Sequence, residues 1–182
     1  DNRGVAFETA IARAMGSVEV ADQLVGTKYL KTLDFIDPKR VSTFGWSYGG
    51  YMTIKMLQAN PGAYAAGIAV APVTRWQLYD THYTERYLGD PNKEPKVYEA
   101  SNALADTGKI TDPLLVIHGM ADDNVVFENS TALIAKLQAE AVPFEMMLYP
   151  GFTHRISGPK VSKHLYETMF RFLDRHGAGS GQ

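Results

Sequence analysis

The sequence predicts an α/β protein in which a parallel sheet is covered by helices on both faces. Two observations support this fold class: short, nearly continuous apolar runs typical of buried strands, and amphipathic segments between those runs. Strands that alternate with helices in this way form parallel sheets, because each helix returns the chain to the starting edge of the sheet. The 182 residues, 45% of them hydrophobic and 21% charged, are enough for one domain with its own core.

The first half of the chain contains two predicted helices around a short strand. Apolar residues recur at helical spacing over 18–33, and one face of this helix carries Val18, Ala21, Leu24, Val25 and Tyr29. The β-rich run at 41–45 predicts a strand. The next helix begins at about residue 48, continues over 51–60 and ends at Pro61 and Gly62.

The second half repeats this alternation. The runs 65–72 and 112–119 have the small apolar composition of strands that are buried on both faces. A helix over 128–141, a strand over 144–150 and a final helix over 162–176 follow in order. We therefore expect a sheet of about four strands.

Residues 72–110 interrupt the regular pattern. They are rich in aromatic and polar residues and sustain no single period. A long irregular insertion in a compact domain is usually functional. Because it lies between two core strands, we expect it at the carboxyl ends of the strands, where α/β sheets bind ligands. The whole partial domain is expected to occupy residues 1–176, with a flexible tail at 177–182.

Composition and charge exclude several classes of function. The net charge is −2 with no basic block, so neither nucleic acid nor an anionic membrane surface is an expected partner. The absence of cysteine excludes disulfides and thiolate metal sites but leaves the compartment open. No apolar run approaches the roughly 20 residues of a membrane helix, and the opening residues lack the features of a signal peptide.

The stretch "GWSYG" at residues 45–49 has the pattern G-x-S-x-G between a predicted strand and a predicted helix. In that setting the serine occupies a tight, strained turn that holds its hydroxyl clear of the backbone. We expect Gly45 and Gly49 to let the strand and the helix approach without Cβ clashes. The helix N-terminus would stabilise negative charge beside Ser47. Ser47 is therefore the candidate nucleophile, and the alternative is an ordinary N-cap serine in a glycine-rich turn.

A nucleophilic serine needs a base, and the base needs an orienting carboxylate. In α/β-hydrolases these groups occur in the chain order Ser, Asp or Glu, His. Asp122 and Asp123 follow the strand 112–119, and His154 follows the strand 144–150. Spacing alone does not separate the two aspartates, and the second one is expected to stabilise its loop by accepting bonds from nearby amides. Weaker histidine candidates, interpreted as polar surface or hydrogen-bonded core positions, are His82, His118, His164 and His176.

Nearly the whole chain, to about His176, resembles the C-terminal half of the catalytic domain in the dipeptidyl peptidase IV branch of the prolyl oligopeptidase family. The stretches "GWSYGGYM", "VAPVTRWQLYDTHYTERYLG" and "HGMADDNVVF" carry the resemblance, and the second is the most specific. "YPGFTHRISG" is a looser match, because relatives often have a small residue where Arg155 follows the histidine.

This resemblance implies a role for each matching position. Ser47 becomes the nucleophile, Asp122 the orienting acid and His154 the base. The backbone amide of Tyr48 becomes one oxyanion donor, and Asn124 would hold a carbonyl of the substrate backbone. The pocket for the residue before the scissile bond, typically proline or alanine, would be lined by the Tyr48 ring, Val73, Trp76, Tyr79, Tyr83 and Val125. A flat, rigid aromatic pocket suits a proline ring, although the aromatic residues of 76–83 could instead be ordinary core.

The resemblance also implies parts that these residues do not include. The family pattern adds an N-terminal β-propeller whose acidic residues bind the free amine of the substrate, further strands of the sheet, and a loop tyrosine as the second oxyanion donor. We therefore expect either these partner segments or self-association through the open edge of the strand 41–45. The resemblance implies a periplasmic or secreted protein, and the sequence itself does not identify the compartment.

The sequence thus predicts a serine peptidase of the dipeptidyl peptidase IV type that acts on peptide substrates. It would release N-terminal dipeptides with proline or alanine before the scissile bond, and no metal or organic cofactor is implied. The alternatives are a small esterase with the same triad and a fragment without catalytic activity. The natural substrate and the oligomeric state are open at this point.

Overall fold

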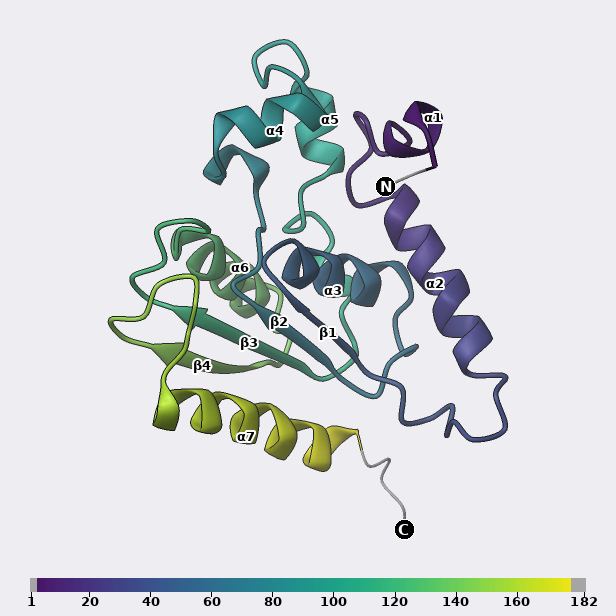
Figure 1. The fold of residues 1–182 in the computed structure, drawn as a ribbon, viewed down its shortest axis with the longest axis vertical. Helices are drawn as coiled ribbons and strands as arrows, with labels where there is room; N and C mark the ends of the chain where they lie inside the picture. Colours follow the sequence, from purple (N-terminus) through teal and green to yellow (C-terminus); the bar gives the residue numbers. More distant parts are fainter. Residues whose placement is uncertain (1–2, 178–182) are drawn as a thin grey trace.

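Residues 3–177 are described by a computed structural model whose centre is a four-stranded sheet (Figure 1). Its strands lie in sequence order, and each neighbouring pair is parallel. The α/β class with a parallel sheet is therefore confirmed, as are four strands. Of the predicted tail at 177–182, all but the first residue lies outside the described residues. The strands are β1 (Thr43–Trp46), β2 (Gly67–Val70), β3 (Leu114–Gly119) and β4 (Glu145–Tyr149).

Helices cover both faces of the sheet (Figure 1). Helices α3 (Tyr48–Ala59) and α6 (Glu128–Ala139) pack on one face, and α7 (Pro159–His176) packs on the other. Helix α2 (Val18–Leu30) lies beside α3, near the edge of the sheet formed by β1. Helix α7 begins at Pro159 rather than at residue 162, because the first turn of a helix does not need the N–H that proline lacks.

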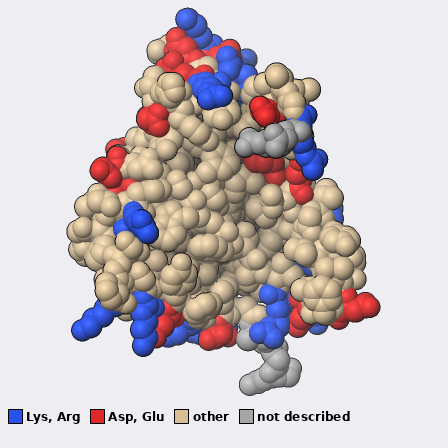
Figure 2. Space-filling view, in the orientation of Figure 1, with Lys and Arg blue, Asp and Glu red and all other residues tan. Residues whose placement is uncertain are grey.

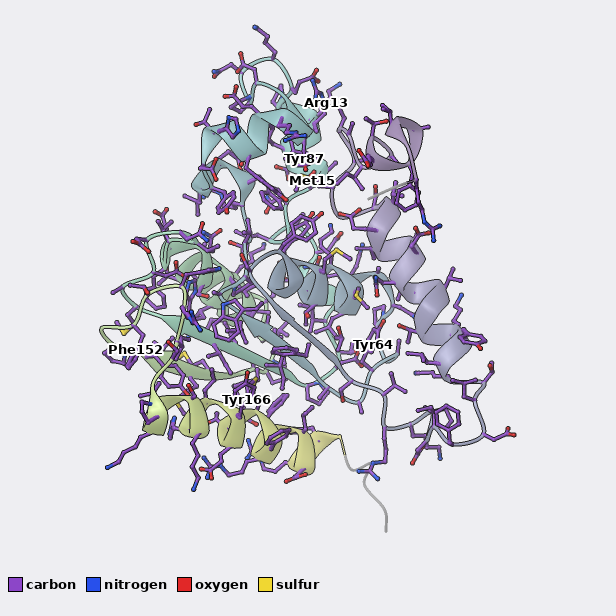
Figure 3. All side chains as sticks on the ribbon, viewed as in Figure 1. Arg13, Met15, Tyr64, Tyr87, Phe152 and Tyr166 are labelled. Atoms are coloured by element: carbon purple, nitrogen blue, oxygen red, sulfur yellow. The ribbon has the colours of Figure 1, made fainter. Side chains whose placement is uncertain are left out.

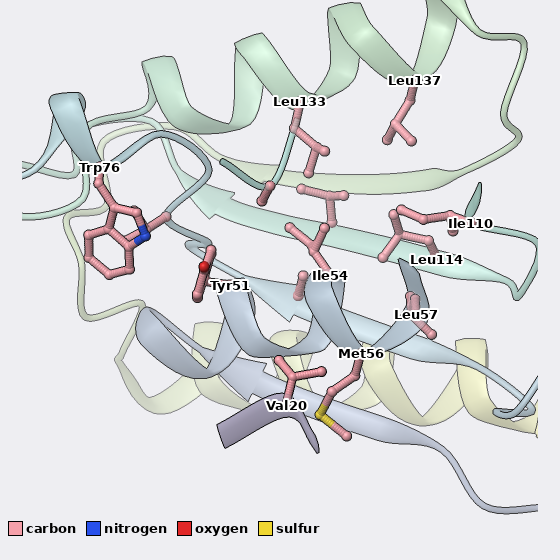
Figure 4. Close-up of a cluster of buried hydrophobic side chains, with 14 of the residues drawn as sticks. Val20, Tyr51, Ile54, Met56, Leu57, Trp76, Ile110, Leu114, Leu133 and Leu137 are labelled. Carbon is pink, nitrogen blue, oxygen red and sulfur yellow. The ribbon is translucent and has the colours of Figure 1, made fainter. Parts of the chain in front are cut away.

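The two faces of the sheet form two separate cores. Successive side chains of a strand point to opposite faces, so Leu114 of β3 packs with α3 and α6, whereas Leu115 packs with α7. Figure 4 shows the first core, whose members include Ile54 of α3 and Leu133 of α6. Trp76 is buried at one end of this core, with only 1% of its surface exposed. This core therefore reaches the segment that follows β2.

The segment 72–110, predicted to be irregular, is helical in large part. The Asp80 carboxylate accepts a hydrogen bond from the Tyr83 amide at 2.8 Å and so caps the first of its helices. That helix has 8 residues, too few to give a clear helical period in the sequence. As expected, the segment stands beyond the carboxyl end of β2 (Figure 1). Its elements are η1 (Trp76–Leu78), α4 (Thr81–Leu88), α5 (Pro95–Ala100) and η2 (Thr107–Lys109).

The first described residues pack against this segment. They include a short helix that the sequence did not predict, α1 (Val5–Glu8). Arg13 N donates a hydrogen bond to Tyr87 O at 2.8 Å, and the Tyr51 hydroxyl lies 3.1 Å from Met15 O. Figure 3 shows Arg13, Met15 and Tyr87 together between α4 and the start of α2. The connection before α2 is therefore joined to both α3 and α4.

The apolar face predicted for the first helix is only partly buried. Leu24 packs against the core, but Val25 and Tyr29 are 66% and 64% exposed. The neighbouring strand β1 is paired on one side only, and its Phe44 is 57% exposed. Hence this edge of the sheet presents apolar surface that nothing within residues 3–177 covers.

Charged side chains gather at the rim of the molecule in the view of Figure 2, whereas the area between is mostly uncharged. The longest helix of the described residues, α7, has 18 residues and buries Leu165, Met169 and Phe172 against the sheet. None of the helices within residues 3–177 has both the length and the apolar character needed to cross a membrane.

Candidate active site

Ser47 stands at a sharp turn between β1 and α3. Its backbone has φ 62° and ψ −118°, a conformation that costs energy for any residue with a Cβ. The Ser47 amide donates to Val70 O at 2.8 Å, which joins the turn to the end of β2. Ser47 occupies the N-cap position of α3, but its side chain makes no capping bond. The strained turn therefore leaves the hydroxyl available, as a nucleophile requires.

Close backbone contacts explain two of the glycines around Ser47. A Cβ at Gly45 would lie 2.0 Å from Gly49 O, and a Cβ at Gly50 would lie 2.8 Å from Val70 O. A Cβ at Gly49 would meet nothing within 4 Å beyond its own helix and neighbours in the described chain. The predicted close approach of strand and helix is thus confirmed, because the Gly45 backbone lies against that of Gly49. A Cβ would clash at Gly45 but not at Gly49, and the sequence did not single out Gly50, the other crowded glycine.

The first turn of α3 brings an amide donor to the same place. Tyr48 is the first residue of that helix, and amides of a first turn have no acceptor within the helix. The positive end of the helix dipole adds to the attraction for a negative oxygen. An oxyanion formed beside Ser47 would therefore find a donor in the Tyr48 N–H.

Asp122 is a buried carboxylate in the loop after β3, with 6% of its surface exposed. Its Oδ1 accepts hydrogen bonds from the amides of Asn124 and Val125, both at 2.9 Å. Its Oδ2 lies 2.8 Å from His154 Nδ1 and 3.1 Å from His118 Nε2. The adjacent Asp123 is exposed. The structure therefore pairs Asp122, and not Asp123, with His154.

His154 lies in the loop after β4, and 25% of its side chain is exposed. Trp46 Nε1 donates to His154 O at 3.1 Å, which holds this loop against the residue next to Ser47. Gly119 makes room for the loop, since a Cβ there would lie 2.4 Å from Phe152 O. The His154 ring is hydrogen-bonded to Asp122, and within residues 3–177 it makes no hydrogen bond to Ser47.

A pocket of about 220 Å³ opens beside Ser47. Val73 and Trp76 are almost fully buried at 2% and 1% exposure, whereas Tyr79 and Tyr83 are half-buried. The aromatic residues therefore belong both to the core and to the pocket, which the sequence treated as alternatives. The pocket is lined by Ser47, Tyr48, Val73, Trp76, Tyr79 and Tyr83.

Ring packing gives this pocket its shape. The Trp76 ring centroid lies 5.6 Å from that of Tyr48 and 5.1 Å from that of Tyr51. Tyr83 stacks on Trp76 at 6.0 Å with 25° between the ring planes. Aromatic pairs at these distances attract each other and restrict one another's movement. Burial raises the pKa of Tyr83 to about 12, so its hydroxyl is neutral at physiological pH.

Two residues predicted to bind substrate, Asn124 and Val125, lie outside the pocket lining. Val125 is fully buried in the core, and its carbonyl oxygen lies 2.9 Å from His118 Nε2. The Asn124 amide is bonded to Asp122, and its side chain is close to the Tyr79 hydroxyl. The roles of both residues in substrate binding are still predictions.

Glu19 of α2 is a neighbour of the pocket that the sequence did not single out. Its Oε1 accepts hydrogen bonds from the Gly16 amide at 2.6 Å and from the Tyr48 hydroxyl. Burial, followed by the bond to this carboxylate, raises the pKa of Tyr48 far above its usual range. An acidic residue in the first turn of a helix is ordinary in a sequence, because it favours the helix dipole, so nothing marked Glu19 as special.

The remaining histidines differ in their surroundings. His82 is exposed, His164 Nδ1 lies 2.9 Å from the Tyr149 hydroxyl, and His176 Nε2 lies 3.0 Å from Glu145. His118 is fully buried and contacts Asp122, which the sequence could not show. Within the part of the chain that the structure describes, no group of three or more His, Cys, Asp or Glu residues is placed to hold a metal ion.

The chain is similar to known proteins in sequence. A family model described as the prolyl oligopeptidase family matches residues 1–180. Dipeptidyl peptidase 4 of Sus scrofa is 41% identical over 182 residues, and that of Bos taurus is 40% identical. Each alignment covers 95% of this chain and 24% of the relative. The chain thus spans about a quarter of the length of the curated relatives it matches.

The similarity extends to the fold. The crystal structure of Porphyromonas gingivalis dipeptidyl peptidase 4 matches with a TM-score of 0.92 and 35% sequence identity. The match covers 96% of this chain and 25% of that chain. The sequence match and the structural match therefore each cover about a quarter of the longer protein to which this chain is compared.

Proposed function

Because the chain belongs to the prolyl oligopeptidase family, we propose that it is the C-terminal part of the catalytic domain of a dipeptidyl peptidase. The enzyme is a serine peptidase that releases dipeptides from the amino end of peptide substrates. The residue before the scissile bond is proline or alanine. Ser47, Asp122 and His154 form the catalytic triad of this proposal.

The observation that carries the proposal is the aromatic pocket that includes Ser47 in its lining. A proline ring is flat and rigid, so it loses little entropy when it enters a pocket of fixed shape. The rings of Trp76 and Tyr83, stacked at 6.0 Å, offer such a shape. A simple esterase for small acyl groups would have no need of this aromatic cluster.

The proposed reaction follows the usual course of serine peptidases. Ser47 Oγ attacks the carbonyl carbon of the scissile bond, and His154 Nε2 accepts the hydroxyl proton. The bond from His154 Nδ1 to Asp122 Oδ2, at 2.8 Å, keeps Nε2 free to act as this base. The Tyr48 amide donates to the oxyanion. His154 then protonates the leaving amine, and water activated by the same residue hydrolyses the acyl-serine.

Further segments complete the enzyme in this proposal. A propeller supplies acidic groups for the substrate amine, and the preceding part of the catalytic domain supplies the second oxyanion donor. Additional strands continue the sheet beyond β1, where Phe44 and Tyr29 are 57% and 64% exposed. Without those strands, an open apolar edge pairs with other chains. The isolated chain should therefore sediment as dimers or larger species, and a monomer at micromolar concentration would contradict this part of the proposal.

Labelling by a fluorophosphonate probe tests the nucleophile without reference to substrate. The full-length protein should be labelled, and Ser47→Ala should not be. Hydrolysis of Gly-Pro and Ala-Pro chromogenic amides should exceed that of Gly-Phe or Gly-Lys amides. Labelling together with hydrolysis of small esters alone would replace the peptidase with an esterase, and failure to label the wild type would overturn a catalytic function.

A further inference from the structure

A buried histidine that the proposed reaction does not use lies at the centre of the polar network below the site. His118 is the penultimate residue of β3 and has 0% of its surface exposed. Its Nδ1 lies 2.7 Å from Ser130 Oγ on α6. Its Nε2 lies 2.9 Å from Val125 O and 3.1 Å from Asp122 Oδ2. Every polar atom of the ring therefore has a partner.

These partners determine which ring nitrogen carries the proton. The Val125 carbonyl can only accept, so Nε2 must carry the proton, and the same N–H donates to Asp122 Oδ2. Burial lowers the pKa of His118, against the opposing effects of the Val125 bond and the Asp122 charge. The ring is then neutral, and Nδ1 accepts a hydrogen bond from the Ser130 hydroxyl. Ser130 thus supports the tautomer that donates to Asp122.

The consequence for Asp122 is that its two oxygens have separate tasks. Oδ1 is held by the amides of Asn124 and Val125 within its own loop. Oδ2 receives one N–H from His118 and one from His154. The His118 bond comes from a strand paired on both sides, whereas the other three donors belong to loops. His118 is therefore the one donor to Asp122 that is anchored in the sheet.

Few charged groups lie near His118 and Asp122. Tyr79, the residue that follows η1, faces Asp122, and burial raises the pKa of its hydroxyl, so it is neutral near pH 7. Asp123 and Arg155, the neighbours of Asp122 and His154 in the chain, are both exposed. The orientation of the Asp122 carboxylate thus depends on hydrogen bonds rather than on a nearby buried charge.

We propose that His118 is a positioning residue for the base: its Nε2–H fixes Asp122 Oδ2 in line with His154 Nδ1 and shares that oxygen with it. The inference rests on the proposed function, because it requires that His154 act on Ser47. A shared oxygen binds each donor less strongly than an unshared one. His118 therefore both directs the His154 ring and limits how strongly Asp122 stabilises its protonated form.

Two substitutions in the full-length protein test this role. His118→Phe keeps a ring against Phe127, 5.5 Å away, but removes both nitrogens. His118→Gln restores an N–H donor on a side chain of similar reach. Active sites are first counted by fluorophosphonate titration, so that a loss of folded enzyme does not count as a loss of rate. His164→Phe, at a histidine bonded to Tyr149, is the matched control.

We expect His118→Phe to lower kcat per titrated site by about 10–100-fold with KM nearly unchanged, the effect of losing one hydrogen bond to a charged group. The acid limb of its kcat/KM profile should move to higher pH, because Oδ2 then serves His154 alone. His118→Gln should recover part of kcat and of the pH shift. His164→Phe should leave both measurements at wild-type values.

Three results would overturn the proposal. One is a His118→Phe enzyme with wild-type kcat per site. Another is a lowered kcat with an unmoved pH profile and no recovery in His118→Gln, which would indicate a packing role only. If His118→Phe yields no folded protein, His118→Asn takes its place, because its shorter amide cannot reach Asp122 Oδ2 in the same way. A His118→Asn enzyme with wild-type kcat and a wild-type pH profile would then overturn the proposal. An unlabelled wild type would instead contradict the proposed function itself.

Discussion

The two sides of the candidate site are held in place by different interactions. On the side of β3 and β4, the Asp122 carboxylate is bonded to four nitrogen atoms at 2.8–3.1 Å. On the side of the 72–110 segment, Trp76 is surrounded by tyrosine rings with centroids 5.1–6.1 Å away. Hydrogen bonds are directional, whereas ring packing defines a shape. The polar side therefore orients the His154 ring, the proposed base, and the aromatic side defines the outline of a pocket.

This difference predicts that catalysis and selectivity can be separated by mutation. Substitutions on the polar side should lower kcat, and substitutions on the aromatic side should change which substrate is preferred. The two sides are joined by the bond from Thr74 N to Asn129 Oδ1 at 2.9 Å. If an aromatic substitution lowered kcat for every substrate alike, the two sides would not be separable by mutation, and this prediction would be wrong.

The largest effect is expected at His154. His154→Ala removes the proposed base, so kcat should fall by about 10⁴–10⁶-fold while KM changes little. His164→Ala, at a histidine bonded to Tyr149 rather than to Asp122, should keep wild-type activity. Steady-state kinetics of the two full-length variants check this. Activity that survives in His154→Ala and disappears in His164→Ala would show that the wrong histidine has been assigned.

The next largest effect is expected at Asp122. Asp122→Asn offers an amide in place of the Oδ2 acceptor, which favours the wrong tautomer of His154, and a loss of about 10⁴-fold in kcat is typical of this change. Asp123→Asn is the matched control, because Asp123 is exposed and has the same change in charge. Equal losses in the two variants would mean that charge, and not the His154 contact, is responsible.

A smaller and different effect is expected at Tyr83. Tyr83→Ala opens the pocket beside Trp76, on which Tyr83 stacks. The preference for Gly-Pro over Gly-Phe amides should narrow by about tenfold, within the 1–3 kcal/mol that pocket shape typically contributes. Fluorophosphonate labelling should continue at a rate close to that of the wild type. Tyr87→Ala, which removes a ring next to Tyr83 but outside the pocket lining, should narrow the preference less.

Glu19 and Tyr48 test whether a polar contact can serve the aromatic side. Tyr48→Phe and Glu19→Ala each remove the bond between the two side chains, so the Tyr48 ring should lose its fixed position. We expect each variant to reduce kcat/KM for Gly-Pro amides by about fivefold, the worth of roughly 1 kcal/mol. The double variant should be little worse than Glu19→Ala alone, because Tyr48→Phe breaks only the bond that Glu19→Ala already removes, whereas Glu19→Ala also removes the acceptor of the Gly16 amide. Additive losses would show that the two residues act separately.

Much of the fold could be predicted because it depends on local patterns. The small apolar runs that became β2 and β3 are buried along their whole length, as their composition implies. The eight residues of α4 give no clear period, and α2 turns Val25 toward solvent although the pattern assigned it to an apolar face. Which face of a helix is buried depends on neighbours distant in the sequence, and periodicity alone does not identify them.

The site shows the same limit. The order of Ser47, Asp122 and His154 could be read along the chain, because each follows a predicted strand. Contacts that cross between elements could not: His118 and Glu19 look like ordinary strand and helix residues until their partners are placed. The G-x-S-x-G pattern identified the close approach of Gly45 to Gly49, but it did not identify Gly50, where a Cβ would meet the end of β2.

The two sides should also differ in how they respond to pH. On the aromatic side, burial raises the pKa of Tyr83 to about 12, so its hydroxyl carries no charge below about pH 10. On the polar side, burial lowers the pKa of His118 below its ordinary value of about 6.5. Above that value the ring is neutral in both the folded and the unfolded chain. As the pH falls below about 6.5, the unfolded chain binds a proton that the folded chain resists, and stability decreases.

The smallest predicted effect is therefore a difference in acid sensitivity. One proton contributes at most about 1.4 kcal/mol of unfolding free energy per pH unit, so between pH 7 and pH 5.5 the wild type should lose more stability than His118→Gln, which has no group to titrate there. Melting temperatures of the full-length proteins across this range measure the difference, a few degrees at most. His82→Gln removes an exposed histidine and should follow the wild type. If the melting temperatures of the wild type and His118→Gln fall in parallel as the pH is lowered, then the burial of His118 does not cause acid sensitivity, and this prediction is wrong.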